Sequence, residues 1–417
     1  MENKQVIHMS ELSLTKRLIA YFVILIGYFF YCYNFSVIDY VRPFLVEFYG
    51  MSLNQTALFY TAQSFGALVG AFSCAWFAEN LGRKKTLIAI TLLNGIGTLV
   101  NMGTTSFTIW MLMRLIIGIS LGGYFTVAVS IMVGLFTGKV RAKVTAIASS
   151  TFSIALMAMG TYAAFLGEAH WEMILGAGGI APVVSAILMI FLVPDEKKVI
   201  PYGKEEAKTE TSTKENIEVK KGTWGEMFSS KYIRFTISCA LLSGLNFIGY
   251  QFFSGFVTVY LREVRGFDAV TMGFIFTATS TGSWLGAYFW GTFADKFGRR
   301  IAGVGFILSS IMICCYFIAP TSAKVLSTFG FVYGLGLSSS AIWGGYFTEL
   351  FPDHLRSMGA SLFHAGRIIA LFAPSIVVWV RNISSLQTAM WGAPVIFTIA
   401  GLIWLSLPET LVGKAKK

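Results

Sequence analysis

Charged residues are scarce in this sequence. Only 13% of its 417 residues are Asp, Glu, Lys or Arg, whereas 55% are hydrophobic and the mean hydropathy is +0.67. A water-soluble domain of this composition would expose a very large apolar surface. The scarcity of charge therefore excludes a soluble protein and predicts an integral membrane protein. The first apolar run is long enough to span a bilayer, so we expect no cleaved signal peptide.

Signals for metal binding, disulfide bonding and catalysis are also lacking. There is no HExxH or GxxxxGK[ST] motif, so we expect neither an enzyme nor a resident cofactor or metal. The cysteines lie in apolar runs, without the spacing of metal ligands or of extracellular disulfides. We interpret all five as small core residues: Cys32, Cys74, Cys239, Cys314 and Cys315.

One stretch of the sequence occurs twice. Residues 61–85 and 277–301 are offset by 216 positions and identical at ten of 25. Each copy is an apolar helix with small residues on one face, which permits close helix packing in a bilayer. An acid, a glycine turn and adjacent cations follow. The first copy has Glu79, Gly82, Arg83 and Lys84, and the second has Asp295, Gly298, Arg299 and Arg300. Such a repeat is typical of transporters built from duplicated bundles.

Apolar runs of about 20 residues, each long enough to cross the hydrocarbon core, predict twelve transmembrane helices. They cover roughly 18–41, 57–78, 86–104, 108–134, 142–166, 173–193, 233–260, 270–292, 302–320, 324–348, 357–380 and 388–408. Most Lys and Arg residues fall on one side, which places both termini in the cytoplasm and argues against nucleic-acid binding. A polar stretch without aromatic residues in its middle predicts a cytoplasmic linker. The expected domains are 1–193, the linker 194–231, and 232–417.

Several motifs resemble the major facilitator superfamily. The repeated loop is similar to its GxLaDrxGRkx signature, although the first copy has Ala75 for Gly and Glu79 for Asp. Further motifs are RxxxGxxxG from Arg114, ExFPxxxRxxG from Glu349 to Arg356 and beyond, and PET at residues 408–410. The resemblance covers all twelve spans. It implies an all-α membrane protein with two pseudo-symmetric six-helix bundles, alternating access, and cargo bound at mid-membrane. It also implies that the loop charges latch one conformation; the alternative is a topology signal alone.

The guanidinium group predicted deepest in the membrane belongs to Arg367. Counting from the start of span eleven places it about 15 Å deep, near the bilayer midplane. An unpaired charge there is costly, so we expect it to face a polar cavity or an acid. Its planar fork suits a carboxylate ligand. His364 lies one turn earlier on the same face and titrates near neutral pH. The alternative is a structural role, with Arg367 bonded to backbone carbonyls or a neighbouring helix.

Polar and aromatic residues in other spans are further candidates for contacts with cargo. Span seven carries Ser243-Gly244-Leu245-Asn246 and Tyr250, similar to part of the sugar-porter signature, followed by Gln251. Asn246 and Tyr250 are four residues apart and share a helix face. The alternative is that they hold helices together. Weaker candidates, which more often pack, are Tyr33, Asn34, Gln63, Tyr124 and Trp343.

Asp39 and Arg114 are the candidates for coupling transport to an ion, and each has an alternative role. Relatives that carry aromatic acids have a DGFD-like pattern in span one, which this chain replaces with Tyr31-Cys32-Tyr33-Asn34. Asp39 follows about a turn later and is either a displaced coupling carboxylate or the partner of Arg42 in a salt bridge at the outer end of the span that contributes little to stability. Arg114 is either a conformational or proton-linked residue or part of a structural ion pair.

These observations favour a secondary transporter in the cell inner membrane that imports a small organic anion with H⁺ or possibly Na⁺. The expected partners are a small-molecule substrate, the coupling ion and the lipid bilayer, and we expect a monomer. A sugar or polyol symporter is the alternative, based on residues 243–250 and the PET ending. Drug efflux is disfavoured because span five has no proline. A sensor that binds cargo without moving it is a third possibility.

Overall fold

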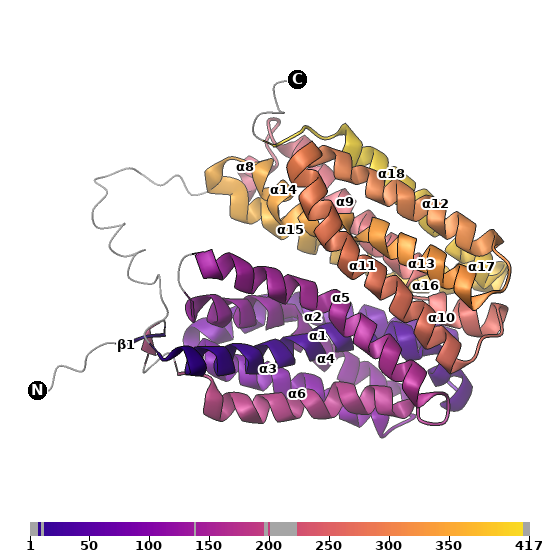
Figure 1. Cartoon of the computed structure of the whole chain (residues 1–417), viewed down its shortest axis with the longest axis horizontal. Helices are drawn as coiled ribbons and strands as arrows, with labels where there is room; N and C mark the ends of the chain where they lie inside the picture. The colour runs from indigo at the N-terminus through magenta and orange to yellow at the C-terminus, as the bar shows by residue number, and fades with distance from the viewer. Residues whose placement is uncertain (1–6, 10–11, 137–138, 196–198, 201–222, 412–417) are drawn as a thin grey trace, which may run out of the picture. The chain divides into compact units, whose positions relative to one another are not determined.

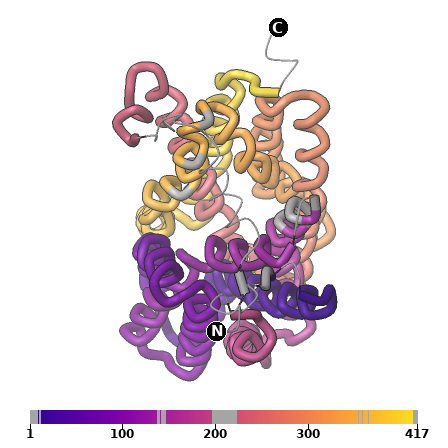
Figure 2. The backbone as a smooth tube through the Cα atoms, turned by 90° about the vertical axis from the view of Figure 1, so that its left-hand side faces the viewer, coloured from indigo at the N-terminus to yellow at the C-terminus, as the bar shows by residue number. Residues whose placement is uncertain are grey.

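The computed structural model describes residues 7–9, 12–136, 139–195, 199–200 and 223–411, and these are almost entirely helical (Figure 1). The first six helices are α1 (Leu14–Phe48), α2 (Leu53–Asn80), α3 (Arg83–Met102), α4 (Phe107–Gly134), α5 (Lys139–Leu166) and α6 (Glu172–Leu192). Two short strands, β1 (Ile7–His8) and β2 (Val199–Ile200), pair in parallel. Seen at right angles, most helices are viewed nearly end-on (Figure 2).

The later helices are shorter because several predicted spans are divided. They are α8 (Trp224–Met227), α9 (Ile233–Phe253), α10 (Val257–Val259), α11 (Ala269–Phe297), α12 (Val304–Ile318), α13 (Ala323–Leu337), α14 (Trp343–Glu349), α15 (Arg356–Ile369), α16 (Ala373–Ile383), α17 (Leu386–Met390) and α18 (Gly392–Ser406). Short π or 3₁₀ turns are η2 (Tyr260–Val264), η3 (Arg300–Gly303), η4 (Ser338–Ile342) and η5 (Asp353–Leu355).

Eleven helical stretches of the described chain are long and apolar enough to cross a membrane. Eleven of the twelve predicted spans therefore have a counterpart by this measure. The remaining one, the eighth, corresponds to α11, a continuous helix of 29 residues. Its many Thr, Ser and Gly residues lower its hydropathy without shortening it. With α11 included, the helices agree with the twelve-helix architecture.

The chain divides into two compact units. Unit 1 comprises Met1–Ile38, Ala62–Ala155 and His170–Glu218. Within it α3 packs against α4 and α6. Small residues of the first repeat bring α2 and α4 close together: a Cβ on Gly66 would lie 2.2 Å from the Leu115 carbonyl oxygen, and one on Gly122 would lie 2.0 Å from that of Ala67. Such contacts exclude side chains larger than hydrogen and fix these two helices against each other.

Unit 2 comprises Asp39–Thr61, Leu156–Ala169 and Val219–Lys417. In it α11 packs against α13, α9 against α15 and α18, and α12 against α13 and α18. The second repeat makes the same kind of close approach as the first, because a Cβ on Gly282 would lie 1.9 Å from the Phe331 carbonyl oxygen. The predicted division into two halves, 1–193 and 232–417, joined by a linker over 194–231, is not tested by these units and stays a prediction.

Several predicted spans of unit 2 are interrupted within the helical stretches that correspond to them. Span seven breaks after Phe253 at Ser254-Gly255, and span ten passes through the serine-rich η4. Span eleven breaks between Ile369 and Ala373, with Pro374 in the first turn of α16. Glycine and serine weaken a helix, and proline favours a new helical start over the continuation of an old one. Backbone groups freed by such breaks need partners inside the protein.

Arg265 caps one helix end in unit 2. Its guanidinium donates to the carbonyl oxygens of Phe317 at 2.8 Å and Ala319 at 2.9 Å, and its Nε donates to the Tyr260 hydroxyl at 2.7 Å. These carbonyls belong to the C-terminal end of α12, where a cation is favoured by the helix dipole.

We predict that Arg265→Met, which keeps the apolar stem but removes every donor, lowers the free energy of unfolding by about 2 kcal/mol. Thermal unfolding of the purified protein in detergent measures this. Lys324→Met, at an exposed position near the start of α13, is the control and should leave the melting temperature unchanged. Equal melting temperatures for the two variants would contradict the capping role.

Candidate functional site

Arg367 lies in the last turn of α15, directly before the break in span eleven. Its side chain is partly exposed, and its Cζ atom lies 5.8 Å from the centroid of the Phe247 ring in α9. The α9 and α15 backbones are very close here, because Ser243 Oγ donates to the Phe363 carbonyl oxygen at 2.6 Å. A guanidinium at a helix C-terminus is stabilised by the helix dipole, and a nearby aromatic ring adds a cation–π attraction.

A pocket in unit 2 lies beside the interruptions of spans seven and ten. Its lining comes mainly from α9, α10, α11 and α13 and includes Tyr250, Ser254, Ser280 and Tyr333, but most of its surface is apolar. Ser254 Oγ and the Tyr333 hydroxyl are 2.9 Å apart. None of the lining residues that the structure describes is charged, and Arg367 is not among them. The remaining lining residues are Leu156, Phe253, Val257, Leu261, Ile275, Phe276, Thr279, Ser283 and Leu337.

The predicted residues of span seven lie on and near this pocket. Tyr250 lines it. Asn246 is partly buried, and its Oδ1 atom has no hydrogen-bond partner in the described structure. Gln251 is almost fully buried, and its Oε1 atom is likewise without a partner. Unpaired buried amide oxygens are uncommon and suit a donor that the chain itself does not supply. The roles of these residues in binding stay predictions.

Three predicted residues of unit 1 form hydrogen bonds with residues of neighbouring helices. Asn34 Nδ2 donates to Asn94 Oδ1 at 3.0 Å and to the Gly178 carbonyl oxygen at 2.7 Å. The Tyr33 hydroxyl donates to the Ile174 carbonyl oxygen at 3.0 Å, and Tyr124 is fully buried with its hydroxyl 3.1 Å from Thr91 Oγ1. These contacts join α1, α3, α4 and α6. They explain why Tyr33, Asn34 and Tyr124 lie where they do even if none of the three binds a ligand.

Arg114 is fully buried in α4 and contacts another predicted residue. Its Nη1 donates to Gln63 Oε1 at 3.2 Å, and its Cζ lies 5.4 Å from the Trp110 ring centroid. Gln63 Nε2 in turn donates to the Phe35 carbonyl oxygen at 3.0 Å. The amide therefore bridges α1 and α4 from α2, so a change at either residue is transmitted to three helices.

Trp343 lies outside the pocket. It is 1% exposed, and its ring centroid lies 5.2 Å from those of both Phe347 and Trp404 and 5.4 Å from that of Phe306. This aromatic cluster accounts for its position by packing.

Asp39 and Arg42 form the expected ion pair, but its burial disagrees with the expectation that the pair contributes little. Arg42 Nη2 lies 3.0 Å from Asp39 Oδ1, and the two side chains are 0% and 3% exposed. Arg42 Cζ also lies 4.2 Å from the Phe256 ring centroid. Because removal of one partner would leave a buried charge, the pair matters far more than an exposed one. The error arose because the sequence does not show that α10 covers the end of α1.

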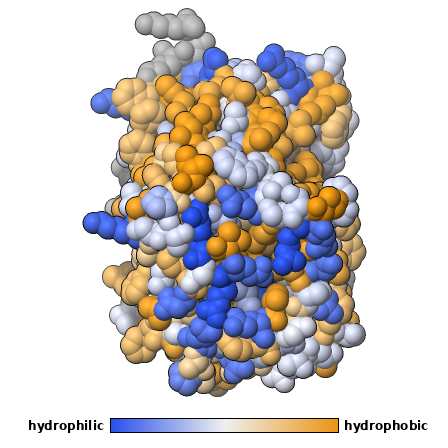
Figure 3. Space-filling model, turned by 90° about the vertical axis from the view of Figure 1, so that its right-hand side faces the viewer, coloured by the Kyte–Doolittle hydropathy of each residue, from blue (hydrophilic) through white to orange (hydrophobic). Residues whose placement is uncertain are grey.

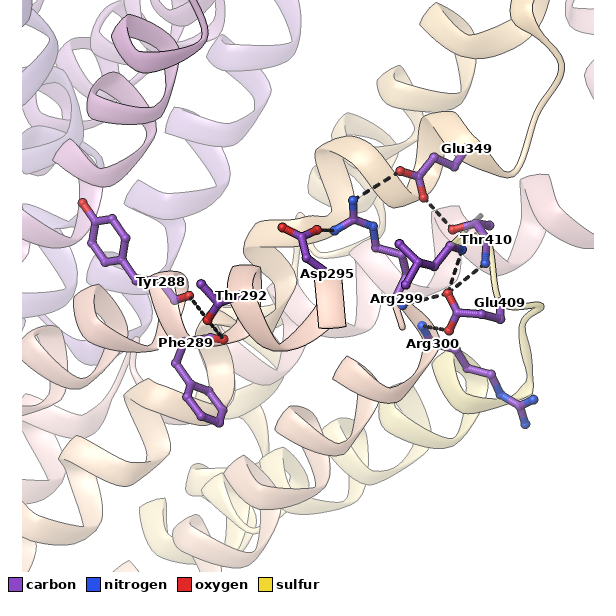
Figure 4. Close-up of polar contacts among 10 residues, drawn as sticks. Tyr288, Phe289, Thr292, Asp295, Arg299, Arg300, Glu349, Glu409 and Thr410 are labelled. Atoms are coloured by element: carbon purple, nitrogen blue, oxygen red, sulfur yellow. Dashed lines mark hydrogen bonds and ion pairs between the residues drawn. The ribbon is translucent and has the colours of Figure 1, made fainter. Parts of the chain in front are cut away.

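The charged residues of the second repeat meet beyond the end of α11 (Figure 4). Gly298 has φ 118°, which turns the chain sharply after this helix. Arg299 lies between two acids: its Nη1 is 2.7 Å from Asp295 Oδ1, and its Nη2 is 3.5 Å from Glu349 Oε1. Glu349 Oε2 accepts from Thr410 Oγ1 at 2.5 Å. The predicted charge cluster is therefore present, and its latching role stays a prediction.

Glu409, which the sequence analysis passed over as part of PET, is the centre of this turn. Its carboxylate accepts backbone N–H bonds from Arg299, Arg300, Thr410 and Leu411 at 2.8 to 3.1 Å. Partial burial raises the pKa of Glu409, but these four donors outweigh burial and leave the pKa below its ordinary value. Glu409 follows the last span and is far from Gly298 in the sequence. No local pattern therefore predicts their contact, which only the fold creates.

The remaining predicted residues lie at exposed or partly exposed positions. In the first repeat, Gly82 has φ 99°, Lys84 Nζ donates to the Ile190 carbonyl oxygen at 2.7 Å, Glu79 is exposed and Arg83 is partly exposed. In unit 2, Arg300 and Arg356 are exposed. The side chain of His364 lies outside the described residues.

A nucleophilic serine motif and a cluster of metal ligands are the features that would indicate other activities. Gly118 to Gly122 match the spacing GxSxG, but Ser120 is fully buried inside α4 and donates to the Ile117 carbonyl oxygen at 2.6 Å. A nucleophile elbow needs an exposed serine on a turn between strand and helix. In the described part of the chain, no group of three or more His, Cys, Asp and Glu residues could hold a metal ion.

Comparisons with known proteins agree with this architecture. The family model described as Major Facilitator Superfamily matches residues 24–280 and 239–417. The cis,cis-muconate transport protein of Acinetobacter baylyi is 25% identical over 344 residues, 81% of each chain. The sialic acid transporter NanX of Escherichia coli is 23% identical over 411 residues, 95% of each chain. The crystal structure of a D-xylose-proton symporter, 16% identical, has a TM-score of 0.72 over 96% of this chain and 99% of that chain, which shows a shared fold.

The carboxylate of Glu409 predicts a pH-dependent stability. Because its folded-state pKa is below the ordinary value, its contribution is present above the unfolded pKa and is lost as the pH falls through the folded pKa. The melting temperature of the wild-type protein should therefore fall at acidic pH by more than that of Glu409→Gln. Measurements of both proteins in detergent between roughly pH 7 and pH 3 test this; parallel curves would contradict it.

Proposed function

The chain belongs to the Major Facilitator Superfamily, and the relatives named above are membrane transporters. We propose that it is a secondary transporter that imports a small organic anion. The proposed cargo class is a carboxylate, and the proposed mechanism is alternating access. The fold alone does not select a cargo, because one fold carries many different substrates. The choice of an anion therefore depends on individual side chains.

The observation that carries the proposal is Arg367 at the break between α15 and α16. Interrupted membrane helices expose backbone groups and line cavities, and binding sites near mid-membrane are commonly built on them. The Phe247 ring centroid lies 5.8 Å from Arg367 Cζ, so the guanidinium has an aromatic neighbour at this break. A carboxylate is the ligand that accepts two parallel N–H bonds from a guanidinium.

The relatives support the same class of cargo. Muconate and sialic acid, the compounds in the two names given above, both carry carboxylate groups. Their structures differ otherwise, since one is a short unsaturated diacid and the other a sugar acid. What the two compounds share is the negative charge, which is the feature that Arg367 would recognise.

The other parts of the proposal follow from the sequence. We propose H⁺ as the coupling ion, with Na⁺ as the alternative, and Asp39 and Arg114 as coupling residues. The arrangement of Lys and Arg residues supports a position in the cell inner membrane with both termini in the cytoplasm. A monomer is sufficient for this mechanism.

A neutral sugar or polyol is the second candidate cargo, based on the resemblance of Ser243 to Tyr250 to the sugar-porter signature and on the PET ending. The pocket in unit 2 does not add to this candidate, because its surface is mostly apolar. Uptake of sugars and of carboxylates by the same purified protein separates the two candidates.

Substitution of Arg367 tests the anion proposal. Arg367→Lys keeps the positive charge but removes the planar fork, so carboxylate uptake into proteoliposomes should fall by about tenfold or more, the effect of losing a bidentate charged contact. The protein should still fold, because the charge and the apolar stem remain.

The matched control is Arg381→Lys, in the last turn of α16, where the guanidinium pairs with Glu263 at 3.3 Å. It should transport as well as the parent. If Arg367→Lys also transports carboxylates at the parental rate, Arg367 does not bind the cargo through its fork.

The coupling ion can be identified with imposed gradients. In proteoliposomes, an inward proton gradient should raise the initial rate of carboxylate uptake, and a protonophore should abolish the increase. Replacement of Na⁺ by K⁺ should leave the rate unchanged. Uptake that follows Na⁺ and ignores the proton gradient would overturn the choice of H⁺.

A further inference from the structure

The short helix before span seven carries two exposed aromatic side chains. Trp224, the first residue of α8, is 53% exposed, and Phe228, at the C-terminal cap of the same helix, is 56% exposed. The two positions are four residues apart, so both side chains lie on one face of the helix. Exposed aromatic residues of this kind are typical of the boundary between lipid headgroups and acyl chains. We call Trp224 and Phe228 the aromatic pair.

The other side of α8 is fixed to the rest of unit 2. Met227 is fully buried, and its carbonyl oxygen accepts a hydrogen bond from Thr236 Oγ1 of α9 at 2.7 Å. Glu226 Oε1 lies 3.0 Å from His354 Nε2 in η5, so the one acid of α8 already has a partner. These contacts hold α8 against α9 and η5. The aromatic pair is therefore presented outward in a fixed orientation.

An apolar surface on α9 continues into the membrane from this point. Ile233, Ile237 and Leu241 recur every four residues and are all exposed, as expected for the lipid-facing stripe of a membrane span. Figure 1 draws α8 at the end of unit 2 opposite α10 and α17. Figure 3 faces that opposite end, where hydrophilic side chains gather among apolar ones. The predicted topology places α8 on the cytoplasmic side, at the level of the inner-leaflet headgroups.

Two cations lie between the aromatic pair and the stripe. Lys231 precedes α9, with its Nζ atom 5.1 Å from the Tyr232 ring centroid, and Arg234 lies in the first turn of α9. Both are exposed, and neither pairs with an acid among the residues that the structure describes. Arg234 is seven residues, or about two helical turns, before Leu241 and lies on the same face. Positive charge is therefore available at the headgroup end of the stripe.

We propose that Trp224, Phe228, Lys231 and Arg234 form a binding site for an anionic phospholipid of the inner leaflet. The two cations contact the phosphate group, and the aromatic pair inserts beside the upper part of the acyl chains. Buried apolar area and attraction to negative charge both contribute to such binding. The inference goes beyond the proposed function, because it involves neither Arg367 nor the cargo.

A lipid accounts for more of the surface than a soluble anion does. A soluble phosphate compound would engage Lys231 and Arg234 but leave the aromatic pair in water. A phospholipid satisfies both features at once, because its charge and its acyl chains are joined in the same molecule. The aromatic pair also continues the lipid-facing stripe of α9, so one leaflet covers the whole surface.

Lipid binding by the purified full chain tests the cations. Phosphatidylglycerol is titrated into the protein in a non-ionic detergent, and native mass spectrometry counts the bound lipid. Lys231→Gln and Arg234→Gln should each lower the affinity of the tightest site about fivefold, the effect of one cation near a lipid surface. Lys16→Gln, at an exposed position in the first turn of α1 on the same predicted side, is the matched control and should leave it unchanged.

The same titration separates the possible ligands. Phosphatidylcholine, which has no net charge, should bind more weakly than phosphatidylglycerol, and glycerol phosphate should not displace the bound lipid. Phe228→Ser keeps both cations but should lower the affinity for phosphatidylglycerol about tenfold, because an apolar side chain no longer leaves water. Parental affinity in Lys231→Gln and Arg234→Gln, equal binding of both lipids, or displacement by glycerol phosphate would each overturn the proposal.

Fluorine NMR locates the aromatic pair in a bilayer. The protein is labelled with fluorotryptophan and placed in nanodiscs, and the resonance missing from Trp224→Phe identifies Trp224. A lipid with a nitroxide close to its headgroup should broaden this resonance strongly, and a water-soluble nitroxide should broaden it weakly. The reverse order would show that Trp224 faces water, which would overturn the proposal whether or not the chain transports carboxylates.

Discussion

An arginine inside an apolar helix has to find its partners within the protein, because the surrounding lipid offers none. Arg42 is held by a buried acid and an aromatic ring, and Arg114 by a glutamine and an indole. Arg367 meets the same constraint at a helix break, beside Phe247. The proposed function follows if the guanidinium of Arg367 has an anionic cargo as its natural ligand.

The helices combine close packing with local breaks, and each has its own cause. Backbone contacts at Gly66 and Gly282 hold neighbouring helices too close for any larger residue, which makes these pairs rigid. The breaks at Ser254-Gly255 and before Pro374 lie in unit 2, near the pocket and Arg367 respectively. Rigid pairs beside broken helices let binding groups lie inside the membrane while the bundle keeps its shape.

Much of the fold could be predicted from the sequence, because hydropathy fixes the spans and the repeat fixes which helices correspond. The breaks were missed although Pro374 was a visible signal, because hydropathy averages over a break. The site was predicted less well. Tyr250 was found from its helix position, but Ser254 and Tyr333 were not, since serine and tyrosine are common in spans that merely pack. The burial of Asp39 and the role of Glu409 depend on segments far away in the chain, so no local pattern could predict them.

The most direct test of the account compares a carboxylate with its uncharged amide. Calorimetry on the purified wild-type protein should measure the equilibrium binding of 4-hydroxybenzoate and of 4-hydroxybenzamide. Another carboxylate and its amide can replace this pair if the carboxylate raises the melting temperature of the protein. The account predicts that the carboxylate binds at least about tenfold more tightly than the amide, as expected when a charged, bidentate contact is lost. Equal affinity for both, or tighter binding of the amide, would contradict an anion-binding site at Arg367.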